Sequence, residues 1–133
     1  RHAGVARGGY VLAQSGTGTP DVILMGSGSE VHIAHEAYTA LASEGVNVRL
    51  VSLPCWSLFD AQDADYRESV LPSTVTRRVS IEAGVTLGWQ KYVGLHGVTI
   101  GVDKFGASAP YQKIYEEYGL TASAVIAAAK GLL

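Results

Sequence analysis

The sequence has little cysteine, little charge and no long hydrophobic run. Its only cysteine, Cys55, excludes an intramolecular disulfide framework and is typical of a reducing compartment, so we expect a cytoplasmic protein. Ten basic and twelve acidic residues give a net charge of −2 without any basic run, which argues against a nucleic-acid partner. The apolar runs are too short to span a membrane, and the first residues lack the apolar block of a signal peptide.

The hydrophobic residues that are present suffice for one core. They make up 47% of the 133 residues, which is a composition and a length typical of a single folded domain. We expect residues 1–8 to be a linker or disordered end and residues 9–133 to form the domain.

Apolar segments recur every 20 to 30 residues and alternate with helical patterns. The continuous apolar run at residues 22–25 is typical of a strand buried on both faces, and the short segment 9–13 of an edge strand. The strands are expected at residues 9–13, 22–25, 46–53, 78–82 and 98–102. Strands that alternate with helices need crossover connections. The sequence therefore predicts an α/β fold, a small Rossmann-like three-layer domain whose mostly parallel sheet of about five strands has helices on both faces.

Capping residues mark the expected helices. A serine of the turn at residues 26–29 should cap a helix that buries Ala34, Ala37, Tyr38 and Leu41 and that ends at Gly45. Asp65, with Glu68 three residues on, should cap a short helix within residues 60–71. A helical turn is expected at residues 87–92, a helix after Pro110, and a last helix capped by Thr121.

A glycine-rich turn follows the second strand and is a candidate weak anion-binding loop. Its residues are Gly26, Ser27, Gly28 and Ser29, at the expected start of a helix, where backbone N–H groups can bind a phosphate. The dinucleotide fingerprint requires a third glycine or alanine, and that position is Val31. No carboxylate ends the next strand. The alternative is a plain tight turn.

Several residues near the carboxyl ends of the strands are candidates for an interdomain interface. They are Glu82, Trp89, Phe105, Gly106 and Ser108. For Glu82 the alternative is an ion pair with Arg77, Arg78 or Lys91, and for Trp89 a ring that closes the local core. The loop that contains Phe105 could also be simple loop-to-helix punctuation. No catalytic, cofactor-binding or metal-binding residue is predicted, because no nucleophile has an identifiable base and the His32, His35, Glu36 group fits a solvated helix face better than a zinc site.

The order of the segments resembles the C-terminal domain of transketolases from about Gly4 onward. The resemblance rests on GGYVL at residues 8–12, DVILMGSGSEV at 21–31, SIEAG at 80–84, FGASAP at 105–110 and YEEYGLT at 115–121. More distant thiamine enzymes share the fold without FGASAP and its flanks.

The resemblance implies a parent enzyme that transfers a two-carbon ketol unit between sugar phosphates in the pentose phosphate pathway. Such a parent is a homodimer whose N-terminal and middle domains hold thiamine diphosphate and a divalent cation, Mg or Ca. The family's GDG…N metal–diphosphate segment is absent here, and Arg1 does not match its phosphate-binding arginine. We therefore expect this chain alone to be catalytically inert, with a structural and interfacial role. The alternatives are a regulatory nucleotide- or phosphate-binding module that uses the Gly26–Glu30 loop, and an independent enzyme that uses Cys55 or Glu82.

Overall fold

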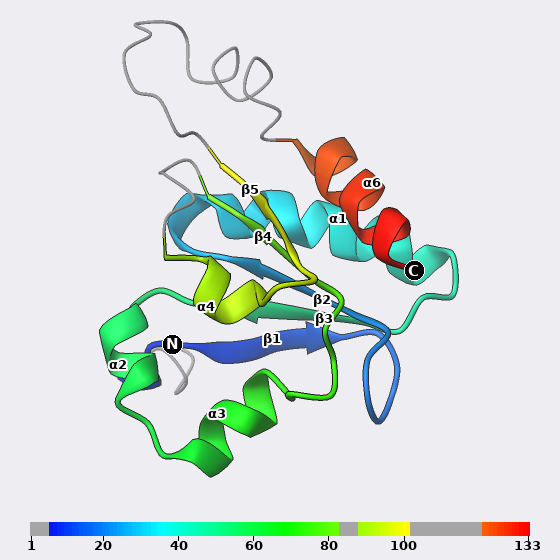
Figure 1. Cartoon of the computed structure of the whole chain (residues 1–133). Helices are drawn as coiled ribbons and strands as arrows, with labels where there is room; N and C mark the ends of the chain where they lie inside the picture. Colours follow the sequence, from blue (N-terminus) through cyan, green and yellow to red (C-terminus); the bar gives the residue numbers. More distant parts are fainter. Residues whose placement is uncertain (1–5, 83–87, 102–120) are drawn as a thin grey trace, which may run out of the picture.

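The computed structural model describes residues 6–82, 88–101 and 121–133, which form one mixed sheet with helices on both sides (Figure 1). The strand order is β1-β3-β2-β4-β5. The bounds of the strands are β1 Tyr10–Gln14, β2 Val22–Gly26, β3 Val48–Ser52, β4 Arg78–Ile81 and β5 Val98–Ile100. Strand β1 lies at one edge and pairs antiparallel with β3, whereas all the other neighbours are parallel. The predicted α/β fold and its edge strand are confirmed.

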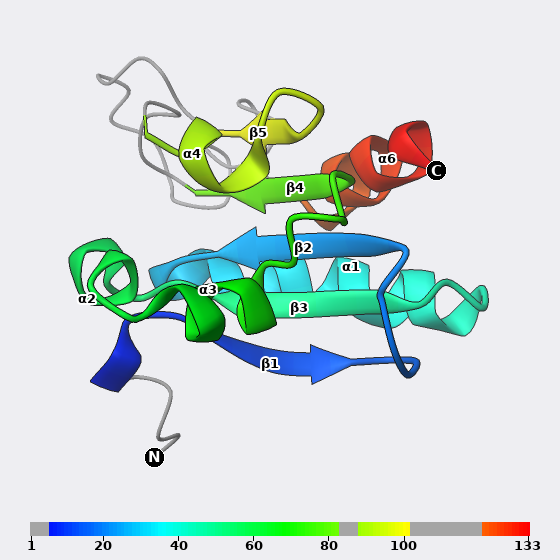
Figure 2. The ribbon, with the colours of Figure 1, turned by 60° about the horizontal axis from the view of Figure 1, so that its bottom comes forward.

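The helices divide between the two faces of the sheet (Figure 2). Helices α1 (Val31–Ser43) and α6 (Ala122–Leu132) cover one face, and α2 (Trp56–Asp60), α3 (Ala64–Val70) and α4 (Gln90–Val93) cover the other. Every residue of β2 is buried, because Val22 and Leu24 point to the first face and Ile23 and Met25 to the second. The uninterrupted apolar run of β2 follows directly from this burial on both faces.

Two of the predicted helix boundaries are confirmed by the backbone. Gly45 follows α1 with a φ of +86°, a conformation in which glycine costs least. Thr121 caps α6, because its hydroxyl oxygen accepts a hydrogen bond from the N–H of Ala124 at 3.2 Å. The helix predicted after Pro110 lies outside the described residues.

Two predicted caps are wrong. The 3₁₀ turn η2 (Gly28–Glu30) precedes α1, whose N-cap is Glu30 without a side-chain capping bond, and Ser27 bonds elsewhere. Helix α3 is capped by Asp63 rather than by Asp65: the Asp63 carboxylate accepts a hydrogen bond from the N–H of Tyr66 at 2.8 Å. Both aspartates have capping chemistry, and the helix begins two residues earlier than the Asp65–Glu68 spacing indicates.

Candidate functional site

Glu82 lies just beyond β4, at the carboxyl edge of the sheet, where sequence analysis placed it. Its carboxylate accepts hydrogen bonds from the Ser27 hydroxyl at 2.9 Å and from the indole N–H of Trp89. The alternative ion pair with Arg77, Arg78 or Lys91 does not form among the described residues, because both of Glu82's partners are neutral donors. Glu82 therefore ties the turn after β2 to the segment that leads into α4.

The glycine-rich turn has the shape but not the charge of an anion site. Gly28 has a φ of +58°, and a Cβ on Gly26 would lie 3.3 Å from the backbone of Val31, so both glycines suit a tight turn. The Ser27 hydroxyl already donates to the Glu82 carboxylate, and Glu30 of the same turn is buried. Two acidic side chains at this turn oppose the binding of an oxyanion, which favours the alternative of a plain tight turn.

Trp89 is placed differently from an exposed interface anchor. Its side chain is 1% exposed, and it meets the ring of Trp56 edge-on at 4.8 Å between centroids. Its bond to Glu82 satisfies the indole N–H, so the whole ring can be buried. Trp89 thus closes the end of the local core, as the alternative expects, and the half-buried Trp56 covers it. Of the other interface candidates, Phe105, Gly106 and Ser108 lie outside the described residues.

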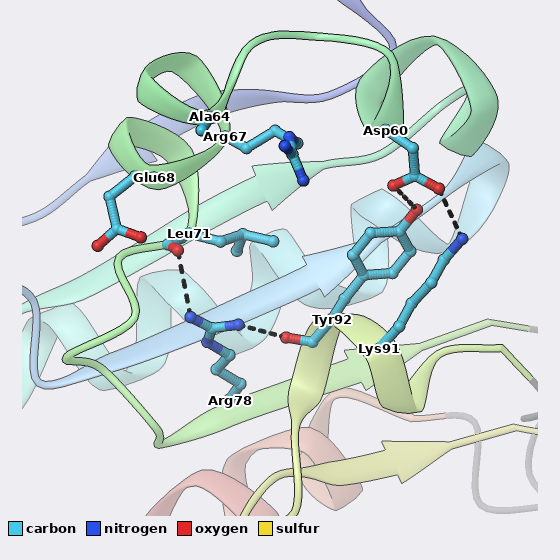
Figure 3. A pocket seen from close by; sticks show the side chains of 8 residues that line it. All are labelled: Asp60, Ala64, Arg67, Glu68, Leu71, Arg78, Lys91 and Tyr92. Atoms are coloured by element: carbon cyan, nitrogen blue, oxygen red, sulfur yellow. Dashed lines mark hydrogen bonds and ion pairs between the residues drawn. The ribbon is translucent and has the colours of Figure 1, made fainter.

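A cavity of about 400 Å³ opens between α2, α3, α4 and the start of β4 (Figure 3). We call it the Arg67–Arg78 cavity. Its lining residues are Asp60, Ala64, Arg67, Glu68, Leu71, Arg78, Lys91 and Tyr92. No sequence pattern predicts this cavity, because its residues come from separate elements and share no motif.

Asp60 connects α2 to α4 at one wall of this cavity. Its carboxylate accepts a hydrogen bond from the Tyr92 hydroxyl at 2.9 Å and forms an ion pair with Lys91 at 2.7 Å. Partial burial raises the pKa of Asp60, but the bonds from Lys91 and Tyr92 outweigh it and leave the pKa below its ordinary value of 3.8. Burial first, and then the bond to Asp60, raise the pKa of Tyr92.

Replacing Asp60 by asparagine should lower the free energy of unfolding by about 0.5–1 kcal/mol at neutral pH, since the ion pair is partly exposed. Because folding depresses the pKa of Asp60, its contribution is present above about pH 4 and is lost as the pH falls through the folded-state value. Urea unfolding of both proteins from pH 7 to pH 2 should show the difference shrinking below pH 4. Glu36→Gln, an exposed change on α1, should shift the stability by less than about 0.5 kcal/mol. A difference for Asp60→Asn that stays constant to pH 2 would contradict the role of the ionised carboxylate.

Arg78 crosses the opposite wall and binds backbone carbonyls. Its Nε donates to Val75 at 2.8 Å and its Nη1 to Tyr92 at 2.5 Å. Its Nη2 donates to Pro72 at 2.7 Å and to Leu71 at 3.3 Å. Burial lowers the pKa of Arg78, and the negative charge of Glu68 opposes this shift only in part. The guanidinium thereby fastens the loop after α3 to α4.

Among the described residues, no three His, Cys, Asp or Glu side chains gather in a way that could hold a metal. The Cys55 thiol has the Ser57 hydroxyl at 3.4 Å as its side-chain partner, and no base is bonded to it within that part of the chain. In residues 6–82, 88–101 and 121–133, no helix is long and apolar enough to cross a membrane.

The N-terminal segment is fixed against α2 and α3. The carbonyl of Gly8 accepts a hydrogen bond from the N–H of Cys55 at 3.0 Å, and the carbonyl of Gly9 accepts one from the Tyr66 hydroxyl at 2.7 Å. The Arg7 guanidinium lies 4.6 Å above the Tyr66 ring. Packing thus extends into the predicted linker, residues 1–8, of which residues 1–5 lie outside the described residues.

Fold and site together define a class: a Rossmann-like α/β domain whose described residues hold no catalytic constellation. The chain belongs to the family described as "Transketolase-like TK C-terminal domain", whose family model matches residues 8–121. It is 60% identical over 128 residues to the chloroplastic transketolase of Solanum tuberosum, and 52% identical over 130 residues to the transketolase of Halalkalibacterium halodurans. These matches cover 96% and 98% of this chain but only 17% and 19% of those proteins.

Solved structures of transketolases also superpose on this chain. The transketolase from Leishmania mexicana superposes with a TM-score of 0.88 at 40% identity, covering 97% of this chain and 18% of that one. A Pichia stipitis transketolase, in complex with sedoheptulose-7-phosphate, superposes with a TM-score of 0.84 at 34% identity. The chain thus spans less than a fifth of the length of these relatives.

The expected cytoplasmic location is contradicted by these relatives. Proteins that are 60%, 59% and 57% identical to the chain, from Solanum tuberosum, Zea mays and Spinacia oleracea, are named chloroplastic transketolases. A low cysteine count constrains only the redox environment and does not distinguish one reducing compartment from another.

Proposed function

We propose that the chain is the C-terminal domain of a transketolase that transfers a two-carbon ketol unit between sugar phosphates in the pentose phosphate pathway. The main support is the 60% sequence identity to the chloroplastic transketolase of Solanum tuberosum. The matching region covers 96% of this chain and only 17% of that protein. Thiamine diphosphate and a divalent cation, Mg or Ca, would then be held outside this chain by the N-terminal and middle domains. The parent would act as a homodimer.

Within such a parent the domain has a structural role. Cofactor-dependent catalysis requires a metal site that converges with the other catalytic groups on the reacting atoms, and no three His, Cys, Asp or Glu side chains gather in a metal-holding way among the described residues. What they offer is a firm attachment, because the segment that leads into the domain is packed against α2 and α3 through Arg7, Gly8 and Gly9. A fixed attachment gives the preceding domain a defined orientation. Phe105, Gly106 and Ser108 remain the proposed contacts to that neighbour.

A chimera tests this function. The 133 residues would replace the matching C-terminal segment of the Solanum tuberosum transketolase, and ketol transfer would be measured with thiamine diphosphate and magnesium. We expect the chimera to be active, because the catalytic groups lie in the retained domains and the substituted domain is 60% identical. The isolated chain should be inactive, and thiamine diphosphate with magnesium should not raise its melting temperature.

The control is the same host protein without any C-terminal segment, which measures what the domain contributes. Ketol transfer by the purified chain alone would disprove the proposal. So would a folded, dimeric chimera that binds thiamine diphosphate and yet has no activity.

A further inference from the structure

The Arg67–Arg78 cavity contains two guanidinium groups that have no carboxylate partner among the described residues. Arg67 projects from α3 into the space between Asp60 and Arg78 (Figure 3). Its Nε donates to the carbonyl of Gln62 at 3.1 Å, while its two Nη groups have no protein partner in the described part of the chain. Four N–H groups of Arg78 bind carbonyls, so one of the five that a guanidinium carries remains free.

The two carboxylates of the cavity are already engaged. Asp60 is paired with Lys91 and accepts the Tyr92 hydroxyl. Glu68 accepts hydrogen bonds from the N–H of Ser73 at 2.8 Å and from its hydroxyl at 3.0 Å. Three cationic and two anionic side chains leave the cavity with one net positive charge, and that charge belongs to the arginines.

We propose that the Arg67–Arg78 cavity binds the phosphate group of a small phosphorylated molecule. Planar guanidinium forks with free N–H groups match the oxygens of phosphate, and two unpaired cations suit a dianion better than a single carboxylate. At about 400 Å³ the cavity lies within the range of small-molecule sites, about 300–1,000 Å³, so it has room for more than the phosphate itself. Ala64, Leu71 and the Tyr92 ring supply apolar contacts for the remainder of the ligand.

This site is distinct from the glycine-rich turn. There the Ser27 hydroxyl is bonded to the carboxylate of Glu82, whereas here the free hydrogen-bonding groups are cationic donors. The proposal uses only contacts within this chain, so it does not depend on the activity of the parent enzyme.

The test is an amide NMR titration of the ¹⁵N-labelled 133-residue chain at constant ionic strength with inorganic phosphate, glycerol phosphate and glycerol. We expect saturable shifts at residues 60–68 and 91–92 with both phosphates, tighter binding of glycerol phosphate, and no shift with glycerol. Arg67→Gln should weaken binding at least about tenfold, the effect of losing a charge-assisted contact. Arg77→Gln removes the same charge at an exposed residue outside this cavity, and should change the affinity by less than about twofold.

Two further variants sharpen the result. Glu68→Gln keeps an acceptor for Ser73 but removes a repelling charge, and should tighten binding about two- to threefold. Arg67→Lys keeps the positive charge but lacks the planar guanidinium, so its affinity for phosphate should lie between those of the wild type and of Arg67→Gln. If Arg67→Gln loses its dispersed spectrum and is therefore unfolded, Arg67→Lys serves as the test. The proposal is overturned if phosphate causes no saturable shift, if glycerol shifts the same amides equally, or if Arg67→Gln and Arg77→Gln weaken binding alike. Saturable amide shifts caused by magnesium instead of phosphate, and abolished by Asp60→Asn, would also overturn the proposal.

Discussion

Replacing Arg78 by methionine should lower the free energy of unfolding by about 3–4 kcal/mol. The side chain of methionine can fill the half-buried space, but it cannot donate to the carbonyls of Leu71, Pro72, Val75 and Tyr92 that Arg78 binds. Hydrogen bonds from a charged donor contribute about 1.5–3 kcal/mol each, and some of the freed carbonyls will recover water. Urea unfolding monitored by the fluorescence of Trp56 and Trp89 measures the loss.

Arg77→Met is the matched control. Arg77 precedes Arg78 and has the same side chain, but it is exposed and forms no ion pair within the described residues, so its loss should cost less than about 0.5 kcal/mol. Arg78→Lys should recover only part of the stability, because one ammonium cannot reach carbonyls on both α4 and the loop after α3. A cost below about 1 kcal/mol for Arg78→Met would mean that the carbonyls are satisfied by water.

Arg78 also shows where prediction from the sequence ends. Its position in a strand was predicted correctly, whereas the one partner considered for it, as one of three basic candidates, was Glu82. Opposite charges suggest partners in a sequence, but Arg78 binds backbone carbonyls, which every residue has and which therefore leave no signature. Arg49 repeats the pattern from β3, where its Nη1 donates to the carbonyls of Ser69 and Val70. The half-buried Arg49 and Arg78 thus bind the carbonyls at the C-terminal end of α3 and just beyond it. Carbonyls at the end of a helix have no partner within the helix and favour a positive charge.

The strands and long helices were predictable because their signals are local. The pattern of apolar residues can be read from neighbouring positions, as in the uninterrupted apolar run of β2 and in the spacing of Ala34, Ala37 and Leu41 on α1. The turn after β2 was predictable as a turn for the same reason. The bond from Ser27 to Glu82 joins residues 55 positions apart, and nothing near either residue in the sequence specifies it.

The Arg67–Arg78 cavity is unpredictable for a further reason. Its residues come from α2, α3, β4 and α4, so their proximity depends on how three short helices pack on one face of the sheet. Short helices owe their position to tertiary packing rather than to propensity. The sequence could place Arg67 on a helix, but not the direction in which its head group extends.

Replacing Gly8 by alanine should lower the free energy of unfolding by about 3 kcal/mol. Gly8 has a φ of +80°, and a Cβ there would overlap the carbonyl oxygen of Cys55 and lie 2.5 Å from the N of Phe59. The left-handed backbone alone costs an alanine about 1–2 kcal/mol. Relief of the overlap requires the N-terminal segment to leave α2 and α3, which gives up the bonds of Gly8 to Cys55 and of Gly9 to Tyr66, at about 1 kcal/mol each. Thermal and urea unfolding measure the total.

Gly18→Ala separates backbone strain from packing in this prediction. Gly18 has a φ of +70°, but no atom lies within 4 Å of a Cβ built on it, so alanine there should cost only the conformational penalty of about 1–2 kcal/mol. Limited trypsin digestion then identifies which part of the domain has opened. In the Gly8→Ala protein cleavage after Arg7 should accelerate more than cleavage after the exposed Arg67, because the segment undocks locally while α3 stays folded. Equal costs for the two substitutions, with no faster cleavage after Arg7, would mean that the segment is loosely held. The domain would then be tethered to its neighbour in a longer protein rather than fixed against it.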